Sequence, residues 1–183
     1  MKIKFKTLSR REAERLLDEI RRLYPSFPLE PDIVERAVVE AGRTLYVLDG
    51  EPCFWESGTS PKLVPVVLCL EPASAGYQWL PGAVFVDKGA AVALARGANL
   101  MVPGIVEVQG EFSEGDVVVA VYRGEGGTEA PMMVGVARMA SRELREAVES
   151  RSRGVAVKKL HHVGDKVWEA ARAIRVRRRG GRS

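Results

Sequence analysis

A change of pattern near the middle of the chain constrains the fold most. Beyond about residue 82, short β-branched and apolar runs alternate with glycine-rich turns, and only two short helical segments interrupt them. Many short strands of this kind are typical of a small barrel. The second half is therefore predicted to form a closed or nearly closed β-barrel. Its expected strands are 83–86, 100–102, 105–108, 117–122, 132–138, 155–157 and 160–163, and its expected helices are 88–96 and 142–150.

The first half has a different pattern. Residues 2–8 alternate and predict a strand, and Ser9 with Glu12 forms a capping box before an amphipathic helix that ends at Pro25 and Pro28. A second helix is expected to begin near Pro31 and close at Gly42. The remaining expected elements are the strands 44–48 and 53–55, joined by a tight turn at Asp49-Gly50, and a strand over 62–70 that is broken at Pro65. The apolar side of the second helix would hold Ile33, Val34, Ala37, Val38 and Ala41.

The segment 71–81 has no clear period and contains Pro72, Gly76 and Pro81, so it is interpreted as the linker between two compact units. We therefore expect an α+β chain with an N-terminal domain at residues 1–75 and a second domain at 82–170.

Charge is unevenly distributed. Residues 151–183 hold eleven Lys and Arg against two acidic residues, a net charge of +9, whereas residues 1–150 carry −5. This asymmetry predicts a basic C-terminal surface that suits a polyanion.

Two cysteines, Cys53 and Cys69, match neither a disulfide framework nor a zinc spacing, and both are expected to be buried thiols in strands. No apolar run reaches the length of a membrane span, and the first residues lack a signal-peptide core. We therefore expect a cytoplasmic protein without a membrane partner.

The sequence lacks recognisable catalytic motifs. It has no phosphate-binding Gly-Lys-Ser/Thr loop, no dinucleotide fingerprint and no nucleophile elbow. Its two histidines, His161 and His162, are adjacent in an expected strand and would point to opposite faces, so they predict no shared site. The chain is therefore expected to be neither an enzyme nor the holder of a metal or cofactor.

The short helix at 88–96 ends in a segment suited to binding. Lys88 opens it and Arg96 closes it, and Gly97 and Ala98 leave little bulk over the backbone. Both cations could rim one groove, with backbone amides at 97–99 meeting a phosphate. An ordinary helix cap packed on a sheet is the alternative.

Five separated blocks resemble the PUA domain, an RNA-binding module. They are residues 86–90 with 96–104, 115–117, 134–139 with Glu143, 154–157 and 164–168. More weakly, the whole chain is similar to the PUA proteins related to the malignant T-cell-amplified sequence protein. This resemblance implies an N-terminal α/β pre-PUA domain followed by a PUA β-pseudobarrel.

The resemblance also implies a function. It predicts a non-enzymatic RNA-binding protein of translation that contacts rRNA or tRNA at the small ribosomal subunit, with an initiation-factor-like protein as a possible partner of the N-terminal domain. An accessory subunit for tRNA or rRNA modification and a protein–protein adaptor are the alternatives. The expected RNA-binding residues are Lys88, Gly89, Arg96, Gly97, Ala98, Asn99, Met101, Lys158 and Lys159.

Residues 171–183 form an arginine-rich tail beyond the last block. Arg177, Arg178 and Arg179 resemble a disordered basic arm that follows a nucleic-acid backbone, and a solubilising terminus is the alternative. Trp168 is expected to anchor the core rather than to stack on a base.

Overall fold

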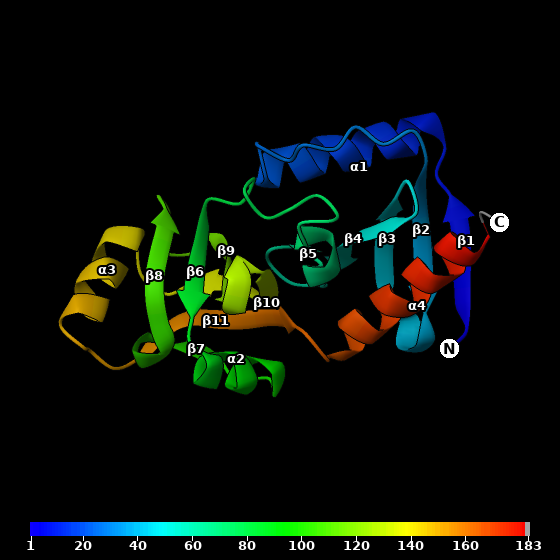
Figure 1. Cartoon of the computed structure of the whole chain (residues 1–183). Coiled ribbons are helices and arrows are strands. Elements are labelled where there is room, and N and C mark those ends of the chain that lie inside the picture. The colour runs from blue at the N-terminus through cyan, green and yellow to red at the C-terminus, as the bar shows by residue number, and fades with distance from the viewer. Residues whose placement is uncertain (182–183) are drawn as a thin grey trace.

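The computed structural model describes residues 1–181 and places two sheets side by side (Figure 1). Within those residues, the first sheet has five antiparallel strands in the order β1-β2-β3-β4-β5. The second has six strands in the order β7-β11-β10-β9-β6-β8, with β6 and β9 parallel. The second sheet curls into a half-barrel, so the prediction of an α+β chain with a pseudobarrel is confirmed.

The first sheet and its partners come mainly from the first half of the chain. Helix α1 begins with the expected capping box, in which Ser9 accepts from Glu12 N–H and Glu12 accepts from Ser9 N–H. The elements are β1 (Ile3–Thr7), α1 (Arg10–Leu23), β2 (Val34–Val39), η1 (Glu40–Gly42), β3 (Thr44–Leu48), β4 (Glu51–Glu56), β5 (Leu63–Pro65) and η2 (Val67–Leu70).

The second sheet follows the expected order closely. The two runs at 155–157 and 160–163 form one continuous strand, with an irregularity near Leu160. The elements are β6 (Gly82–Val86), α2 (Lys88–Ala95), β7 (Leu100–Met101), η3 (Val102–Gly104), β8 (Ile105–Gly110), β9 (Val117–Arg123), η4 (Glu125–Gly127), β10 (Glu129–Ala137), α3 (Ser141–Glu149), β11 (Val155–His162) and α4 (Lys166–Gly180).

The helix expected from Pro31 to Gly42 is wrong. Residues 34–39 form β2, which pairs with β1 on one side and β3 on the other. Three valines stiffen this segment in favour of a strand. Asp49 also accepts hydrogen bonds from the amides of Asp32 and Ile33, which fixes the strand's entry in an extended form. A strand over 62–70 is likewise wrong beyond Pro65, where η2 follows.

The segment 71–81 joins the halves without separating them. Trp79 is buried, with its ring centroid 4.9 Å from that of Phe27 and 5.5 Å from that of Tyr24. One core cluster contains residues of both sheets, among them Leu70 and Phe85. The two sheets are therefore packed together rather than connected by a free linker.

Cys53 and Cys69 form a disulfide, with their Cα atoms 4.9 Å apart. The prediction of two thiols in strands is therefore wrong, although both residues are buried. Cys69 lies in η2, which turns back against β4 after β5 has ended. Such proximity depends on a tertiary turn, so a separation of sixteen residues could not reveal it.

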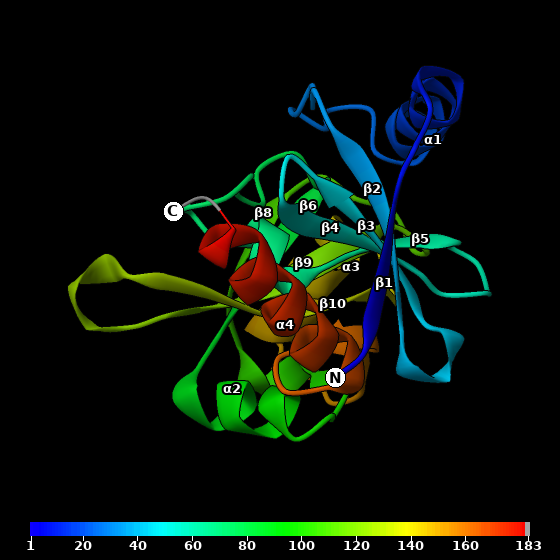
Figure 2. The ribbon, with the colours of Figure 1, turned by 90° about the vertical axis from the view of Figure 1, so that its right-hand side faces the viewer.

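The expected disordered arm is also wrong over the described residues. Residues 166–180 form the single helix α4, so the boundary predicted after residue 170 falls inside it. Ala170, Ala171 and Ile174 are buried in a cluster with Ala37 and Leu45 of the first sheet. Helix α4 therefore lies across a face of the N-terminal sheet (Figure 2). Residues 182 and 183 lie outside the described part of the chain.

Candidate nucleic-acid interface

Helix α2 is defined by its caps. Asp87 accepts a hydrogen bond from Ala90 N–H at 2.8 Å and starts the helix. Arg96 is the C-cap, and Gly97 follows with φ +94°, a left-handed conformation that glycine adopts without strain. Ala91 and Leu94 face the core beneath the helix.

The opposite side of α2 is exposed and combines cations with small residues. Lys88 and Arg96 are separated by two steps of four residues, so they lie on one stripe about 12 Å long. Between them are Gly89 and Ala93, which add little height to the surface, and Val92, which is 45% exposed. A phosphate chain can approach this stripe closely and meet a cation at each end.

The backbone amides at the end of α2 are not free to bind a phosphate. Gly97 N–H donates to Leu94 O at 2.9 Å, and Ala98 N–H donates to Ala93 O at 3.1 Å. The prediction that these two amides meet a phosphate is therefore wrong, because they complete the helix cap. A helix C-terminus also carries partial negative charge, so cationic side chains must supply the attraction there.

Lys159 supplies such a charge. Its Nζ donates to Gly97 O at 2.6 Å, and its backbone N–H donates to Asn99 Oδ1 at 2.9 Å. These two bonds tie β11 to the segment that follows α2. An ammonium group has three donors, so Lys159 keeps capacity for an anion. Asn99 holds the corner with its oxygen, which supports the interpretation of a structural amide while its NH₂ remains on an exposed residue.

His162 also reaches this corner, which the sequence did not indicate. A methyl group added to Gly97 would lie 3.2 Å from His162 Nε2 and 3.4 Å from Lys159 Nζ. Residues three apart in a regular strand point to opposite faces, but the irregularity beside Leu160 brings both side chains to one place. His162 Nδ1–H donates to Val163 O at 2.8 Å, which leaves Nε2 facing the corner.

His161 has a structural role, as expected. It is fully buried, its Nδ1 bonds Asp165, and its Nε2 accepts from Val67 N–H at 3.1 Å. Burial raises the pKa of Asp165, but the His161 bond and the amides of Trp168 and His162 outweigh it and hold that pKa below its usual value. This network joins β11, the start of α4 and η2.

The two remaining residues expected to contact RNA, Met101 and Lys158, lie beside this surface rather than within it. Met101 is 45% exposed in β7, next to β11. Lys158 is exposed, but as the neighbour of Lys159 in a strand it points the other way. We call the surface of Lys88, Gly89, Arg96, Gly97, Ala98, Asn99, Lys159 and His162 the α2 corner.

Two of the three expected tail contacts are engaged within the protein. Arg178 pairs with Glu35 and lies over the Phe5 ring, 3.7 Å from its centroid, while Arg177 donates to the carbonyl of Met1. Arg179 is exposed and makes no ion pair within residues 1–181.

Residues 1–181 contain neither a candidate membrane helix nor a candidate metal site. Their helices include none with the length and apolar character of a membrane span. Within the same residues, no three His, Cys, Asp or Glu side chains are grouped so as to hold a metal ion.

Comparison with known domains divides the chain at the same place as the two sheets. The PUA domain model matches residues 82–163, and the model described as Domain of unknown function (DUF1947) matches residues 6–72. The PUA match assigns the second half to a class of RNA-binding domains. It covers α2, the α2 corner and all of β11, including Lys159 and His162.

Individual relatives extend over more of the chain. The uncharacterized protein MJ1432 of Methanocaldococcus jannaschii is 30% identical over 88% of this chain and 93% of its own. Translation machinery-associated protein 20 of Schizosaccharomyces pombe is 31% identical over 68% of this chain, which spans 65% of that protein. Glutamate 5-kinases of Xylella fastidiosa match over only 27% of their length.

A solved structure agrees over nearly the whole fold. The crystal structure of a PUA domain (APE0525) from Aeropyrum pernix K1, a tartrate complex, has a TM-score of 0.83 at 38% identity, covering 94% of this chain and 93% of that one. The chain therefore belongs to the family of PUA-domain proteins related to the malignant T-cell-amplified sequence protein, in which a DUF1947 domain precedes the PUA domain.

Proposed function

We propose that this protein binds RNA of the translation machinery through the α2 corner and catalyses no reaction. One observation carries the proposal: within a matched PUA domain, Lys88, Arg96 and Lys159 gather on a surface of small residues. Lysine and arginine neutralise phosphates, and the small residues allow the backbone of the RNA to come close.

The proposed ligands are rRNA and tRNA at the small ribosomal subunit. The translation-related name of the Schizosaccharomyces pombe relative supports this context. The α2 corner offers one imidazole and no large aromatic ring, which favours recognition of RNA shape and backbone over extruded bases. Met101 and Lys158 would extend the contact along the neighbouring strands. An initiation-factor-like protein would then meet the N-terminal domain.

The test compares Lys88→Glu/Arg96→Glu with Arg142→Glu, in binding of total tRNA and purified small subunits over a range of salt. Arg142 is an exposed arginine of α3 that pairs with Glu146, so its reversal shows what a charge reversal outside the α2 corner does to binding. We expect the double variant to lose at least tenfold in affinity at about 50 mM salt and the control to lose little. Absence of RNA binding by the wild type, or equal losses in both variants, would contradict the proposal.

Co-purification from cells separates this function from its alternatives. Recovery with small subunits supports it, whereas stoichiometric recovery with an RNA-modifying enzyme would favour an accessory role in modification. A protein adaptor would keep its activity when Lys88 and Arg96 are reversed, so retained activity would also contradict RNA binding as the function.

A further inference from the structure

The arginines of α4 are of two kinds. Arg175 is half-buried, with its Nε 2.7 Å from Glu51 Oε1 and its Nη1 3.2 Å from Glu71 Oε1, and Arg178 pairs with Glu35. Arg172 and Arg179 are exposed, and neither forms an ion pair within residues 1–181. The first kind fastens the helix to the N-terminal sheet, and the second remains available to a ligand.

The available arginines lie on one stripe of α4. Trp168, Arg172, Val176 and Arg179 occur at steps of four, four and three, which confines them to roughly 80° of the helix surface. Val176 is 69% exposed although it is apolar. Ile174, on the other side, is fully buried against the first sheet. We call the four residues the α4 stripe.

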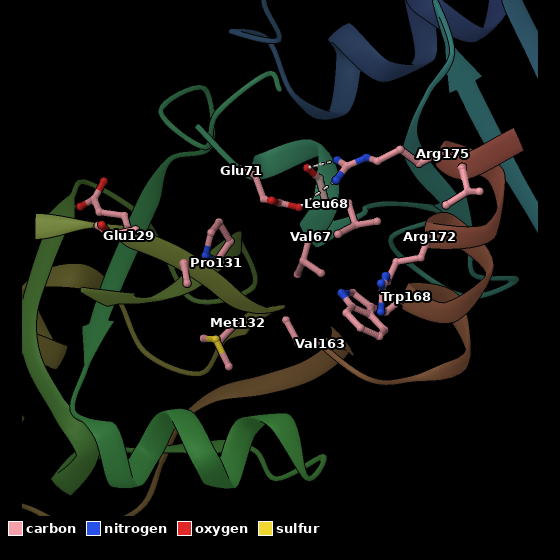
Figure 3. Close-up of a pocket in the computed structure, with 13 residues that line it drawn as sticks. Val67, Leu68, Glu71, Glu129, Pro131, Met132, Val163, Trp168, Arg172 and Arg175 are labelled. Atoms are coloured by element: carbon pink, nitrogen blue, oxygen red, sulfur yellow. Dashed lines mark hydrogen bonds and ion pairs between the residues drawn. The ribbon is translucent and has the colours of Figure 1, made fainter. Parts of the chain in front are cut away.

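A hollow of about 620 Å³ lies beside the α4 stripe (Figure 3). Its apolar lining includes Val67, Met132 and Val163, and Trp168 forms one wall. The guanidinium of Arg172 lies over the Trp168 ring, 4.8 Å from its centroid. An arginine plane backed by an indole is a surface on which a nucleobase can stack. The volume falls in the range of pockets that hold small ligands.

The hollow adjoins the α2 corner. His162 reaches the corner, and the next residue, Val163, lines the hollow. The backbone beyond it stays near α2, since a methyl group on Gly164 would lie 3.6 Å from Ala95 O. Helix α2 runs directly below the hollow in Figure 3. One strand of a ligand can therefore pass from the corner to the stripe.

Charge decides the kind of ligand. Among the described residues, the exposed charges of α4 are Lys166, Arg172, Arg177 and Arg179 against Glu169. Two carboxylates also line the hollow, but Glu71 pairs with Arg175 and Glu129 pairs with Arg123. Such an excess of unpaired cations next to a second cationic surface is suited to a continuous polyanion, which can occupy both. An acidic protein segment would also be attracted, but the stacked Trp168–Arg172 pair favours a ligand with bases.

We propose that the α4 stripe extends the RNA-binding surface beyond the PUA module, with phosphates on Arg172 and Arg179 and a base against the Trp168–Arg172 pair. This inference rests on the proposed function, because it assumes that RNA occupies the α2 corner. In this proposal the basic segment acts as a folded helix rather than as a flexible arm. Arg175 and Arg178 fix the helix to the N-terminal sheet, and this holds Arg172 and Arg179 in position.

The experiment measures binding of total tRNA by Arg172→Glu, Arg179→Glu and the double variant over a range of salt, with Arg142→Glu as the control. Both target residues are exposed, so folding should persist, and thermal melting checks it. Each lost phosphate contact should lower the slope of log affinity against log salt by roughly 0.7–0.9. The control should keep the wild-type slope.

Ultraviolet crosslinking of the wild-type complex supplies a second readout. We expect bound nucleotide on the tryptic peptide Val167–Arg172, which contains Trp168. The inference is overturned if that peptide stays unmodified and the double variant keeps the wild-type slope. Loss of binding by Lys88→Glu/Arg96→Glu in the same series would then leave the proposed function standing. A wild type that binds no tRNA would reject both.

Discussion

The α2 corner and helix α4 contain the same kinds of cation but use them differently. In the corner, Lys88 and Arg96 stand exposed at the ends of a surface of small residues. In α4, Arg175 and Arg178 turn inward and pair with Glu51 and Glu35 of the N-terminal sheet. A basic run in a sequence therefore does not measure how much positive charge a ligand meets. The partners that the fold provides decide this.

The comparison also changes the role of the acidic first half. Its Glu35, Glu51 and Glu71 meet the arginines of α4, so part of the charge asymmetry is neutralised inside the molecule. Up to Gly180, the segment expected to be an arm belongs to helix α4, whose Ala171 and Ile174 are buried against the N-terminal sheet. Deleting residues 172–183 would remove the buried Ile174, so point substitutions are the informative variants.

The largest expected effect is on stability and concerns Arg175, which fixes α4 to the N-terminal sheet. Arg175→Ala should lower the free energy of unfolding by about 3–5 kcal/mol, because it leaves Glu51 poorly solvated and unpaired. Arg172→Ala, one turn earlier and exposed, should cost less than about 0.5 kcal/mol. Urea unfolding of both proteins checks the difference. Similar losses would show that the two arginines do not differ in role.

The next effect concerns the junction between the two regions. Asp165→Asn keeps a capping oxygen but loses the carboxylate that binds His161, so it should cost about 2 kcal/mol at neutral pH. The folded-state pKa of Asp165 is lowered, so its contribution is complete above the ordinary value of 3.8 and disappears as pH falls through the folded-state pKa.

Unfolding measured at several pH values tests this sign. The stability difference between wild type and Asp165→Asn should shrink as the solution becomes acidic. A difference that stays constant with pH would mean that packing, rather than the charge of Asp165, stabilises the junction.

A smaller effect is expected at the α2 corner itself. Gly97→Ala should cost about 1 kcal/mol, because alanine is strained at φ +94°. The added methyl would also press on His162 and Lys159, so tRNA affinity should fall. Gly115→Ala is a matched control, since Gly115 has φ +93° and open space around it. It should lose similar stability and keep its tRNA affinity.

The smallest effect tests the comparison directly. Arg96→Gln should lower the salt slope of tRNA binding by roughly 0.7–0.9, the value for one phosphate contact. Arg178→Gln removes the same charge but should leave that slope unchanged, because Glu35 already neutralises it. Anisotropy titrations at four or more salt concentrations would measure both slopes. Equal changes would indicate that Arg178 leaves Glu35 when RNA binds.

Local patterns in the sequence predicted much of the fold. The capping box at Ser9 and Glu12, the caps of α2 at Asp87 and Gly97, and most strands of the second sheet depend on residues close in sequence. The prediction of a helix over residues 34–39 was wrong because the spacing of their apolar residues fits a helix as well as a strand. The pairing of this segment with β1 and β3 decided between them, and pairing is not local.

For the site, the sequence by itself determined which residues were available: small residues and cations around α2, and a strongly basic C-terminal segment. Tertiary structure decided their roles. The irregularity in β11 brought His162 close to Lys159. The amides of Gly97 and Ala98 are hydrogen-bonded in the helix cap, and Arg175 and Arg178 are ion-paired where α4 packs on the rest of the protein. The physical reason is that a charge or a donor becomes free or occupied only through its neighbours in space, and these come from distant parts of the chain.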